Sequence, residues 1–574
     1  MLVKISVESY DLSDASAKMI RALSEFRIRG VKTNIPFLNN ILTNPTFITG
    51  KATVNFINND ESLFNFRLPR DRATKVARYI ADINVNGHSG VKYVDPSTKL
   101  ASPRVPEFNA SADYTDGTKQ KLTALGADGF SHWLKQEKKI HYTDTTFRDA
   151  HQSLLATRMR TIDMLKVAEG FAKNHPQVFS MEVWGGATFD VCMRFLLENP
   201  WERLASIRKA VPNILLQMLL RGSNAVGYTA YPDNLIQEFV IRSWETGVDL
   251  FRIFDSQNWM PSIAPCIDYV RKYTGGLAEG CICYTGDILQ PNRTKYDLSY
   301  YVQLAKDIEN AGAHIIAIKD MAGLLKPYAA SELIGALKAE VHVPIHLHTH
   351  DTSSIQSATY LKAIEAGVDV VDVALNGMSG LTSQPGFNSI VEMLKYHERE
   401  QPFEMRSLNA YSQYWGDVRT MYYPFESGLK SGTSEVYQHE IPGGQYSNLK
   451  PQAEGLGLGD RFYEITNMYA EVNELFGDII KVTPSSKVVG DMAQFLISNN
   501  LNIGDVLQKG ETLSFPKSVI DFFKGDLGQP VTPFPKALQD IILKDVEPFT
   551  GRPNKHLMPI DFDYDFKAFQ KEYK

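Results

Sequence analysis

The sequence predicts an α/β fold: a (β/α)8 TIM barrel, a C-terminal helical domain over the barrel mouth and a small N-terminal α+β extension. From residue 140 onward, short apolar segments rich in β-branched residues alternate with helical periodicity eight times. Each unit spans about 30 to 35 residues, which is typical of βαβ repeats around a parallel sheet. Eight units in about 265 residues match the size of a closed barrel. An open doubly wound sheet is the alternative, but no Gly-x-Gly-x-x-Gly motif follows the first strand.

The predicted strands are the eight short apolar segments, at residues 140–147, 179–184, 213–220, 248–254, 277–284, 312–319, 343–350 and 367–375. Helical periodicity predicts the connecting helices at residues 196–210, 235–247, 263–273, 300–311, 331–340 and 355–366. The barrel is therefore assigned to residues 131–405. Beyond it the alternation stops, and residues 406–574 are predicted to be mostly helical.

Two regions precede the barrel. Residues 1–55 carry an amphipathic helix over residues 12–26 and a second short helix, but they contain no complete hydrophobic core. Residues 56–130 have mixed character, with a predicted helix over residues 70–84, and are interpreted as a linker.

Composition and charge exclude several classes of protein. The 574 residues are 43% hydrophobic and 22% charged, which is ordinary for a soluble globular protein. The net charge is −6 and the sequence has no run of basic residues, so nothing indicates binding to a nucleic-acid polymer. No apolar stretch is long enough for a membrane span and no signal peptide precedes the first helix, so a cytoplasmic location is expected. The four cysteines lack zinc-knuckle spacing and are expected to be free thiols.

A ladder of histidines ends the seventh predicted strand. His346, His348 and His350 alternate, so on a strand their imidazoles project to one face. Imidazole binds zinc, manganese, iron and nickel, and a pair of histidines supplies half of a metal site. The alternative is a polar strand end with satisfied histidines.

Polar groups follow the carboxyl ends of all eight predicted strands, the end at which barrel enzymes place their active sites. These groups include Asp144, Arg148, Asp149, Gln152, Glu182, Asp190, Arg221, Tyr228, Asp255, Lys319, Asp320, His348, His350 and Asn376. From the residues alone, Asp144 and Asp149 are equal candidates for a metal-binding carboxylate. The pattern predicts an active site at this end.

Lys319 lies where the buried sixth strand meets the barrel mouth. An unpaired buried ammonium is costly, so three interpretations compete. The lysine could pair with Asp320, act as a Schiff-base or general-base residue, or be carbamylated by CO2 into an anionic oxygen ligand. The residues alone favour the salt bridge.

Three longer runs resemble the pyruvate carboxylase family, within the metal-dependent barrels that include hydroxymethylglutaryl-CoA lyase and isopropylmalate synthase. The runs are TTFRDAHQSLLATR at 145–158, EVWGGATFD at 182–190 and LLRGSNAVGY at 219–228. In addition, GVKTNIPFL at 30–38 resembles the last segment of a biotin carboxylase domain. The resemblance covers the whole chain. It implies that residues 1–55 are a remnant of that domain and that residues 56–130 are a linker and allosteric segment involved in tetramerisation.

The resemblance also implies roles for individual residues. It selects Asp149, the carbamate of Lys319 (N6-carboxylysine), His348 and His350 as ligands of a divalent metal such as manganese or zinc. Arg221 is expected to hold the substrate carboxylate, with Gln152, Arg148 and Asp190 shaping the pocket. Thr483 is expected to shuttle a proton, while Tyr228, Ser486 and Lys487 contact biotin. Thr483 could also be a helix N-cap followed by Pro484.

The implied activity is transfer of a carboxyl group from carboxybiotin to pyruvate, giving oxaloacetate for anaplerosis and gluconeogenesis. The implied partners are a biotin carrier domain and further copies of the chain, as a dimer through the barrel and a tetramer at full length. No biotin-attachment Met-Lys-Met motif occurs, so a truncated chain unable to use ATP by itself is expected.

Several alternatives stay open. An oxaloacetate decarboxylase α-subunit, a transcarboxylase, and a barrel aldolase or acyl-CoA lyase would use the same fold. An assembly and regulatory module is the alternative from another class. In that case Tyr301 and Tyr328 are candidates to stack on cyclic di-AMP, as in some bacterial relatives, or simply to pack at a surface.

Overall fold

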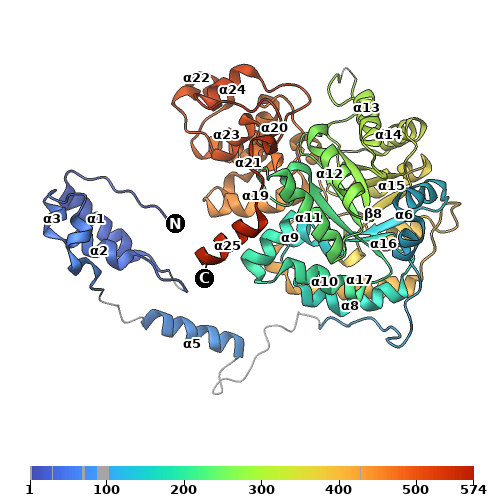
Figure 1. The fold of residues 1–574 in the computed structure, drawn as a ribbon, viewed down its shortest axis with the longest axis horizontal. Coiled ribbons are helices and arrows are strands. Elements are labelled where there is room, and N and C mark those ends of the chain that lie inside the picture. Colours follow the sequence, from blue (N-terminus) through green and yellow to red (C-terminus); the bar gives the residue numbers. More distant parts are fainter. Residues whose placement is uncertain are drawn as a thin grey trace. The chain divides into compact units, whose positions relative to one another are not determined.

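In the computed structural model, the structure describes residues 3–28, 30–66, 72–86, 102–291, 293–426 and 428–573. Contacts divide the chain into two compact units, Met1–Thr98 and Lys99–Lys574. Figure 1 draws both, with the first unit in blue. Parts of the predicted linker, residues 67–71 and 87–101, lie outside the described residues.

The first unit is helical in its described residues. Its helices are α1 (Leu12–Glu25), α2 (Ile35–Thr43), α3 (Pro45–Ile48), α4 (Phe56–Asn59) and α5 (Arg72–Asn86). Helix α1 begins where the Asp11 side chain accepts a hydrogen bond from the backbone of Asp14 at 2.8 Å. The strand content expected of an α+β extension is therefore not found in the described part of this unit.

The second unit is built on a closed barrel of eight parallel strands, which confirms the predicted fold. The strands are β1 (His141–Asp144), β2 (Ser180–Trp184), β3 (Leu215–Arg221), β4 (Leu250–Phe254), β5 (Leu277–Cys283), β6 (Ile315–Asp320), β7 (Ile345–Thr349) and β8 (Val370–Val373). Strand β1 pairs with both β2 and β8, with His141 opposite Val370, and this pairing closes the sheet. Closure leaves the barrel without an exposed strand edge.

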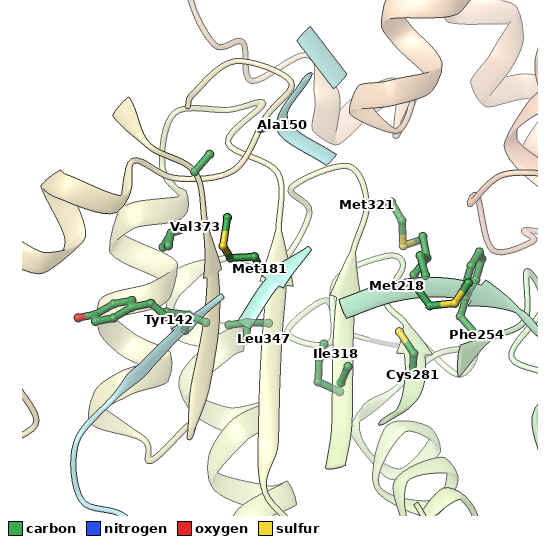
Figure 2. Close-up of a cluster of buried hydrophobic side chains, with 14 of the residues drawn as sticks. Tyr142, Ala150, Met181, Met218, Phe254, Cys281, Ile318, Met321, Leu347 and Val373 are labelled. Atoms are coloured by element: carbon green, nitrogen blue, oxygen red, sulfur yellow. The ribbon is translucent and has the colours of Figure 1, made fainter. Parts of the chain in front are cut away.

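Helices between the strands surround the barrel, close to the predicted ranges. They are α7 (His151–Leu155), α8 (Thr161–Asn174), α9 (Gly186–Val191), α10 (Pro200–Ala210), α11 (Asp233–Thr246), α12 (Met260–Tyr273), α13 (Leu298–Asn310), α14 (Pro327–Glu340), α15 (Gln356–Glu365) and α16 (Phe387–Met393). Alternation along each strand sends apolar side chains such as Leu347, Ile318 and Val373 into the apolar cluster of Figure 2. On the other face of the same strands, His348 contacts both Lys319 and Asp372.

Helix α6 (Thr118–Gln136) closes the amino-terminal end of the barrel. Its Leu122, Phe130 and Leu134 pack against the first residues of the strands, among them Leu215 and Leu250. These three side chains are at most 4% exposed. The barrel unit thus includes residues before the predicted boundary at residue 131, because the apolar face of α6 is needed to cover the strand ends.

The C-terminal region is helical, as predicted; its first helix packs with the helices around the barrel, and the helices from residue 443 to 543 gather in a separate orange and red group (Figure 1). Its helices are α17 (Met405–Met421), α18 (Val436–His439), α19 (Gly443–Gly455), α20 (Phe462–Leu475), α21 (Ser485–Ser498), α22 (Ile503–Lys509), α23 (Lys517–Lys524), α24 (Lys536–Leu543) and α25 (Phe562–Tyr573). Helices α19 to α24 enclose an apolar core of their own. Across the described residues, no helix has both the length and the apolar character that spanning a membrane requires.

Candidate active site

A cavity of about 50 Å³ lies at the carboxyl ends of the strands, where the sequence predicts the site. The barrel contributes most of its wall. The C-terminal region completes the wall with Pro442, Gly444, Gln445, Val482 and Thr483. Of the predicted site residues, the cavity brings together Arg148, Asp149, Gln152, Arg221, Lys319, His350 and Thr483.

The two histidines at the end of β7 present their Nε2 atoms to each other at 3.1 Å. The Nδ1 atom of His348 lies 2.6 Å from an Asp372 carboxylate oxygen, and Nδ1 of His350 lies 2.6 Å from the Thr382 carbonyl oxygen. Both partners only accept hydrogen bonds, so each Nδ1 carries the proton. Burial lowers the pKa of both histidines, and Lys319 adds to this effect. Two neutral imidazoles therefore aim lone pairs at one point.

Asp149 brings a carboxylate to the same point. Its Oδ2 atom lies 3.3 Å from Nε2 of His348 and 3.4 Å from Nε2 of His350. Burial alone would raise the pKa of Asp149, but the Arg148 guanidinium, together with Lys319 and the two histidines, outweighs it and holds that pKa well below its usual range. Asp144 instead accepts hydrogen bonds from the backbone and hydroxyl of Thr146. The geometry thus favours Asp149 over Asp144.

Lys319 completes the group, with its Nζ 3.2 Å from Nε2 of His348. The salt bridge with Asp320 that the sequence favoured is wrong. The Asp320 carboxylate accepts hydrogen bonds from the backbone of Leu324 and Leu325 and from the Thr349 hydroxyl, at 2.7 to 2.9 Å. Neighbouring residues of a strand point to opposite faces, so Lys319 and Asp320 cannot share one environment.

Asp149, His348 and His350 fit a divalent metal. Their ligand atoms all lie within 4.8 Å of one another, and all three residues are buried. Two facing lone pairs beside a carboxylate make a poor hydrogen-bonded arrangement, but they are a favourable donor set for a borderline or hard cation. This chemistry, read from the orientation of the imidazoles, supports a metal site.

Arg148 connects the ligand group to the second strand. Its guanidinium contacts the Asp149 carboxylate, lies 2.9 Å from Glu182 and donates to Gln152 at 3.2 Å. Burial raises the pKa of Glu182 to about 7, although Arg148 opposes the change. Arg148 therefore orients the carboxylate ligand and one side of the cavity.

Arg221, the last residue of β3, points into the cavity. It donates from Nη1 to the carbonyl oxygens of Gly227 and Val226, at 2.8 and 3.3 Å. No acidic side chain among the described residues lies within 4.0 Å of its guanidinium. Burial lowers the pKa of Arg221, yet an arginine stays charged. Its free nitrogens can therefore bind a carboxylate from outside the chain.

Thr483 reaches the cavity from the C-terminal region. Helix α21 begins at Ser485 with Pro484 before it, so Thr483 lies outside the helix and is not its N-cap. No hydrogen bond joins its hydroxyl to another described residue. The Thr483 hydroxyl is therefore available to a ligand.

Four of the residues predicted to bind substrate or biotin lie away from the cavity wall. Asp190 pairs with Arg194 at 3.0 Å, and Lys487 pairs with Asp491 at 2.5 Å. Ser486 is fully buried, with no partner for its hydroxyl oxygen. The Tyr228 ring lies 4.9 Å from the Arg221 guanidinium and is 46% exposed, so it borders the approach to the cavity.

The two candidate nucleotide-binding tyrosines differ in environment. Tyr301 is fully buried, stacked on Tyr284, and exchanges hydrogen bonds of 2.9 Å with the backbone of Thr285. Tyr328 is 72% exposed. Tyr301 thus has no free ring face for a base, because the core uses both its ring and its hydroxyl.

Sequence reasoning missed the groups that hold the ligands in place. The Asp372 carboxylate contacts His348, His346 and Arg252, all fully buried inside the barrel. Gln384 donates to Asp149 at 2.9 Å. A single acid in the apolar run of β8 was a usable signal for Asp372, whereas Gln384 lies in a loop whose path the sequence does not reveal.

A closed parallel barrel whose mouth gathers a histidine pair, a carboxylate and an arginine without an acidic partner defines the class: a (β/α)8 barrel with side chains that could hold a metal ion. The HMGL-like family matches residues 254–414. The conserved carboxylase domain matches residues 436–574, and the biotin carboxylase C-terminal domain matches residues 1–59.

Curated relatives and solved structures narrow the class. The chain is 53% identical to the pyruvate carboxylases of Bacillus subtilis and Staphylococcus aureus, over 100% and 98% of its length. It spans about half the length of these relatives. The carboxyl transferase domain from Rhizobium etli pyruvate carboxylase is 52% identical, with a TM-score of 0.82 over 88% of this chain and 84% of that one. The chain belongs to the pyruvate carboxylase family. The Rhizobium etli domain has been solved with pyruvate, and with oxamate and biotin.

Proposed function

We propose that this chain transfers the carboxyl group of carboxybiotin to pyruvate, forming oxaloacetate. One observation carries the proposal: a buried arginine without an acidic partner faces the same small cavity as His350 and Asp149, which form one buried cluster with His348. The guanidinium of Arg221 matches the planar carboxylate of pyruvate in two parallel hydrogen bonds. The relatives' names, and the Rhizobium etli domain solved with pyruvate, support this choice of substrate.

Asp149, His348 and His350 would hold the divalent metal, with a carbamate of Lys319 as the fourth ligand. The carbamate would replace an amine that now lies 3.2 Å from an imidazole nitrogen with an anionic oxygen donor. A metal at this place supplies a Lewis acid that polarises the substrate carbonyl. Asp372 and the Thr382 carbonyl fix the tautomers that leave both Nε2 atoms free to bind it.

In the reaction, the C–N bond of carboxybiotin breaks and releases CO2. Thr483 passes a proton from the pyruvate methyl group to the biotin nitrogen. Arg221 holds the carboxylate of the resulting enolate, whose methylene carbon then attacks CO2 to give oxaloacetate. A biotin carrier domain would deliver the carboxybiotin, and further copies of the chain would form the oligomer. The proposed function does not include binding of cyclic di-AMP, because Tyr301 is fully buried in the core.

The test is oxaloacetate decarboxylation by the purified chain with free biotin, together with metal analysis. We expect one divalent ion per chain and a rate that rises with biotin. A Thr483→Ala protein should lose the biotin-dependent rate, and Thr483→Ser should retain much of it because the hydroxyl remains. Full activity in Thr483→Ala would exclude the proton relay, and a metal-free chain that still decarboxylates would exclude the metal site.

A further inference from the structure

A second cavity, of about 490 Å³, lies outside the catalytic cleft. It is bounded by the segment after α7, by the helical turn Cys192–Leu196 and by the end of α17. The two cavities have no lining residue in common. Its volume falls within the range of about 300 to 1,000 Å³ that is usual for small-molecule sites. Phe195, Leu196, Met421 and Phe425 make its wall largely apolar.

Arg158 brings a positive charge into this apolar wall. Its guanidinium lies 3.5 Å from the centroid of the Phe195 ring and 5.4 Å from that of Phe425. Its Nη1 atom is buried and lacks a hydrogen-bond partner. Among the described residues, no carboxylate lies within 4.0 Å of Arg158. A partly buried cation without an anion is unfavourable, and a bound anion would relieve the cost.

Arg160, the second arginine of the wall, is already neutralised. It contacts Asp163 at 3.1 Å and donates to the Tyr422 hydroxyl at 3.1 Å. The Tyr422 hydroxyl in turn donates to Asp163 at 2.5 Å. These contacts fix one side of the cavity, and they leave Arg158 as the wall arginine without a carboxylate in direct contact, although Asp190 acts on it from beyond 4.0 Å.

The cavity adjoins the catalytic cleft through one continuous segment. Phe195 and Leu196 belong to the helical turn Cys192–Leu196, which directly follows α9. Gly186 and Ala187, at the start of α9, line the catalytic cleft. A ligand in the second cavity would therefore touch the segment that borders the cleft.

We propose that this cavity binds a small organic anion. Its planar or acyl body lies against Phe195 and Phe425, and its phosphate or carboxylate pairs with Arg158. The guanidinium suits both head groups, because it offers parallel donors to paired oxygen atoms. Stacking of Arg158 on Phe195 holds the guanidinium in place before the ligand binds. This binding does not depend on the proposed carboxyl transfer.

Isothermal titration of the full chain with phenyl phosphate, benzoate and phenol tests the proposal. We expect saturable binding of one anion per chain for phenyl phosphate, benzoate or both, and much weaker binding of phenol. The comparison of the two anions identifies the preferred head group. Arg158→Met should weaken anion binding at least tenfold. Met421→Trp, which fills the cavity and leaves the charge in place, should abolish it.

Two controls separate this cavity from other positive sites. Arg242→Met removes a guanidinium that is 61% exposed on α11 and should leave binding unchanged. Arg221→Met removes the arginine of the catalytic cleft and should also leave it unchanged. The proposal is overturned if the parent binds neither anion, if phenol binds as tightly, or if Arg221→Met rather than Arg158→Met loses binding. If Arg158→Met does not fold, retained binding in Met421→Trp overturns the proposal and lost binding supports it.

Discussion

Replacing Asp372 by asparagine tests the inner layer of the barrel, which holds the metal ligands in place. Asp372 lies 2.6 Å from Nδ1 of His348 and 2.6 Å from Nε2 of His346, and its other contact is the Arg252 guanidinium. Asparagine keeps the volume, but it offers one acceptor oxygen in place of two and places an N–H group against a donor. We expect both weaker metal binding and a smaller free energy of unfolding.

The two effects have different sizes. Loss of a carboxylate that orients a histidine ligand lowers metal affinity by about 10- to 100-fold, or about 1.4 to 2.7 kcal/mol. Removing one partner of a buried ion pair costs about 3 to 5 kcal/mol of unfolding free energy. Arg252 keeps its contact with Glu279, so the lower end of that range is expected.

Metal affinity can be measured by competition with a chelator, and stability by urea denaturation of the metal-free protein. The matched control is Asp144→Asn, which removes a buried carboxylate at the end of β1 that contacts Thr146 and no metal ligand. The control should keep the metal affinity of the parent. A folded Asp372→Asn protein that binds metal as tightly as the parent would refute the reasoning.

Three further predictions follow from single contacts. Gly186→Ala should raise the KM for oxaloacetate in steady-state assays, because the new Cβ would lie 2.7 Å from the Arg221 guanidinium carbon. The control Gly335→Ala should leave the KM unchanged, because no atom lies within 4 Å of the Cβ it adds. Burial raises the pKa of Asp255 to about 6, so the folded protein binds the extra proton and its free energy of unfolding falls as pH rises from about 4 to 6. The Asp255→Asn protein should not show this fall. In urea denaturation, its free energy of unfolding relative to that of the parent should rise by up to about 3 kcal/mol between pH 4 and pH 7. Tyr301→Phe should lose about 1 to 3 kcal/mol of unfolding free energy by the same assay, because a buried backbone amide and carbonyl lose their partner; unchanged stability would mean that the hydroxyl is not needed there.

The fold was predictable because the barrel repeats one pattern. Each β/α unit carries a strand signal and a helix signal at regular spacing, so an error in one unit does not change the class. The seventh predicted strand, 343–350, contains the observed β7 at Ile345–Thr349. Helix α6 was harder to place, because its function is to cover the strand ends of units that come later in the chain.

The site was predictable where residues follow strands and unpredictable where they depend on packing between distant segments. Arg221 and the histidine pair are at strand ends, so topology alone brings them together. The prediction of a salt bridge between Lys319 and Asp320 was wrong because neighbouring residues on a strand point to opposite faces. The positions of Ser486 and Lys487 depend on how α21 lies over the mouth, which local patterns do not determine.

Barrel closure through β1 and β8 has a consequence for synthesis on the ribosome. Residue 141 cannot pair with residue 370 until about 229 further residues have been synthesised. Long-range pairing of this kind slows folding. Until then, the first strands form an open sheet with an exposed edge, and the apolar face of α6 is not yet covered by the later strands. The residues proposed to bind the metal come from β6, β7 and the segment after β1, and Thr483 comes later still. During translation, the nascent chain must therefore be protected from aggregation well before the proposed metal site is complete.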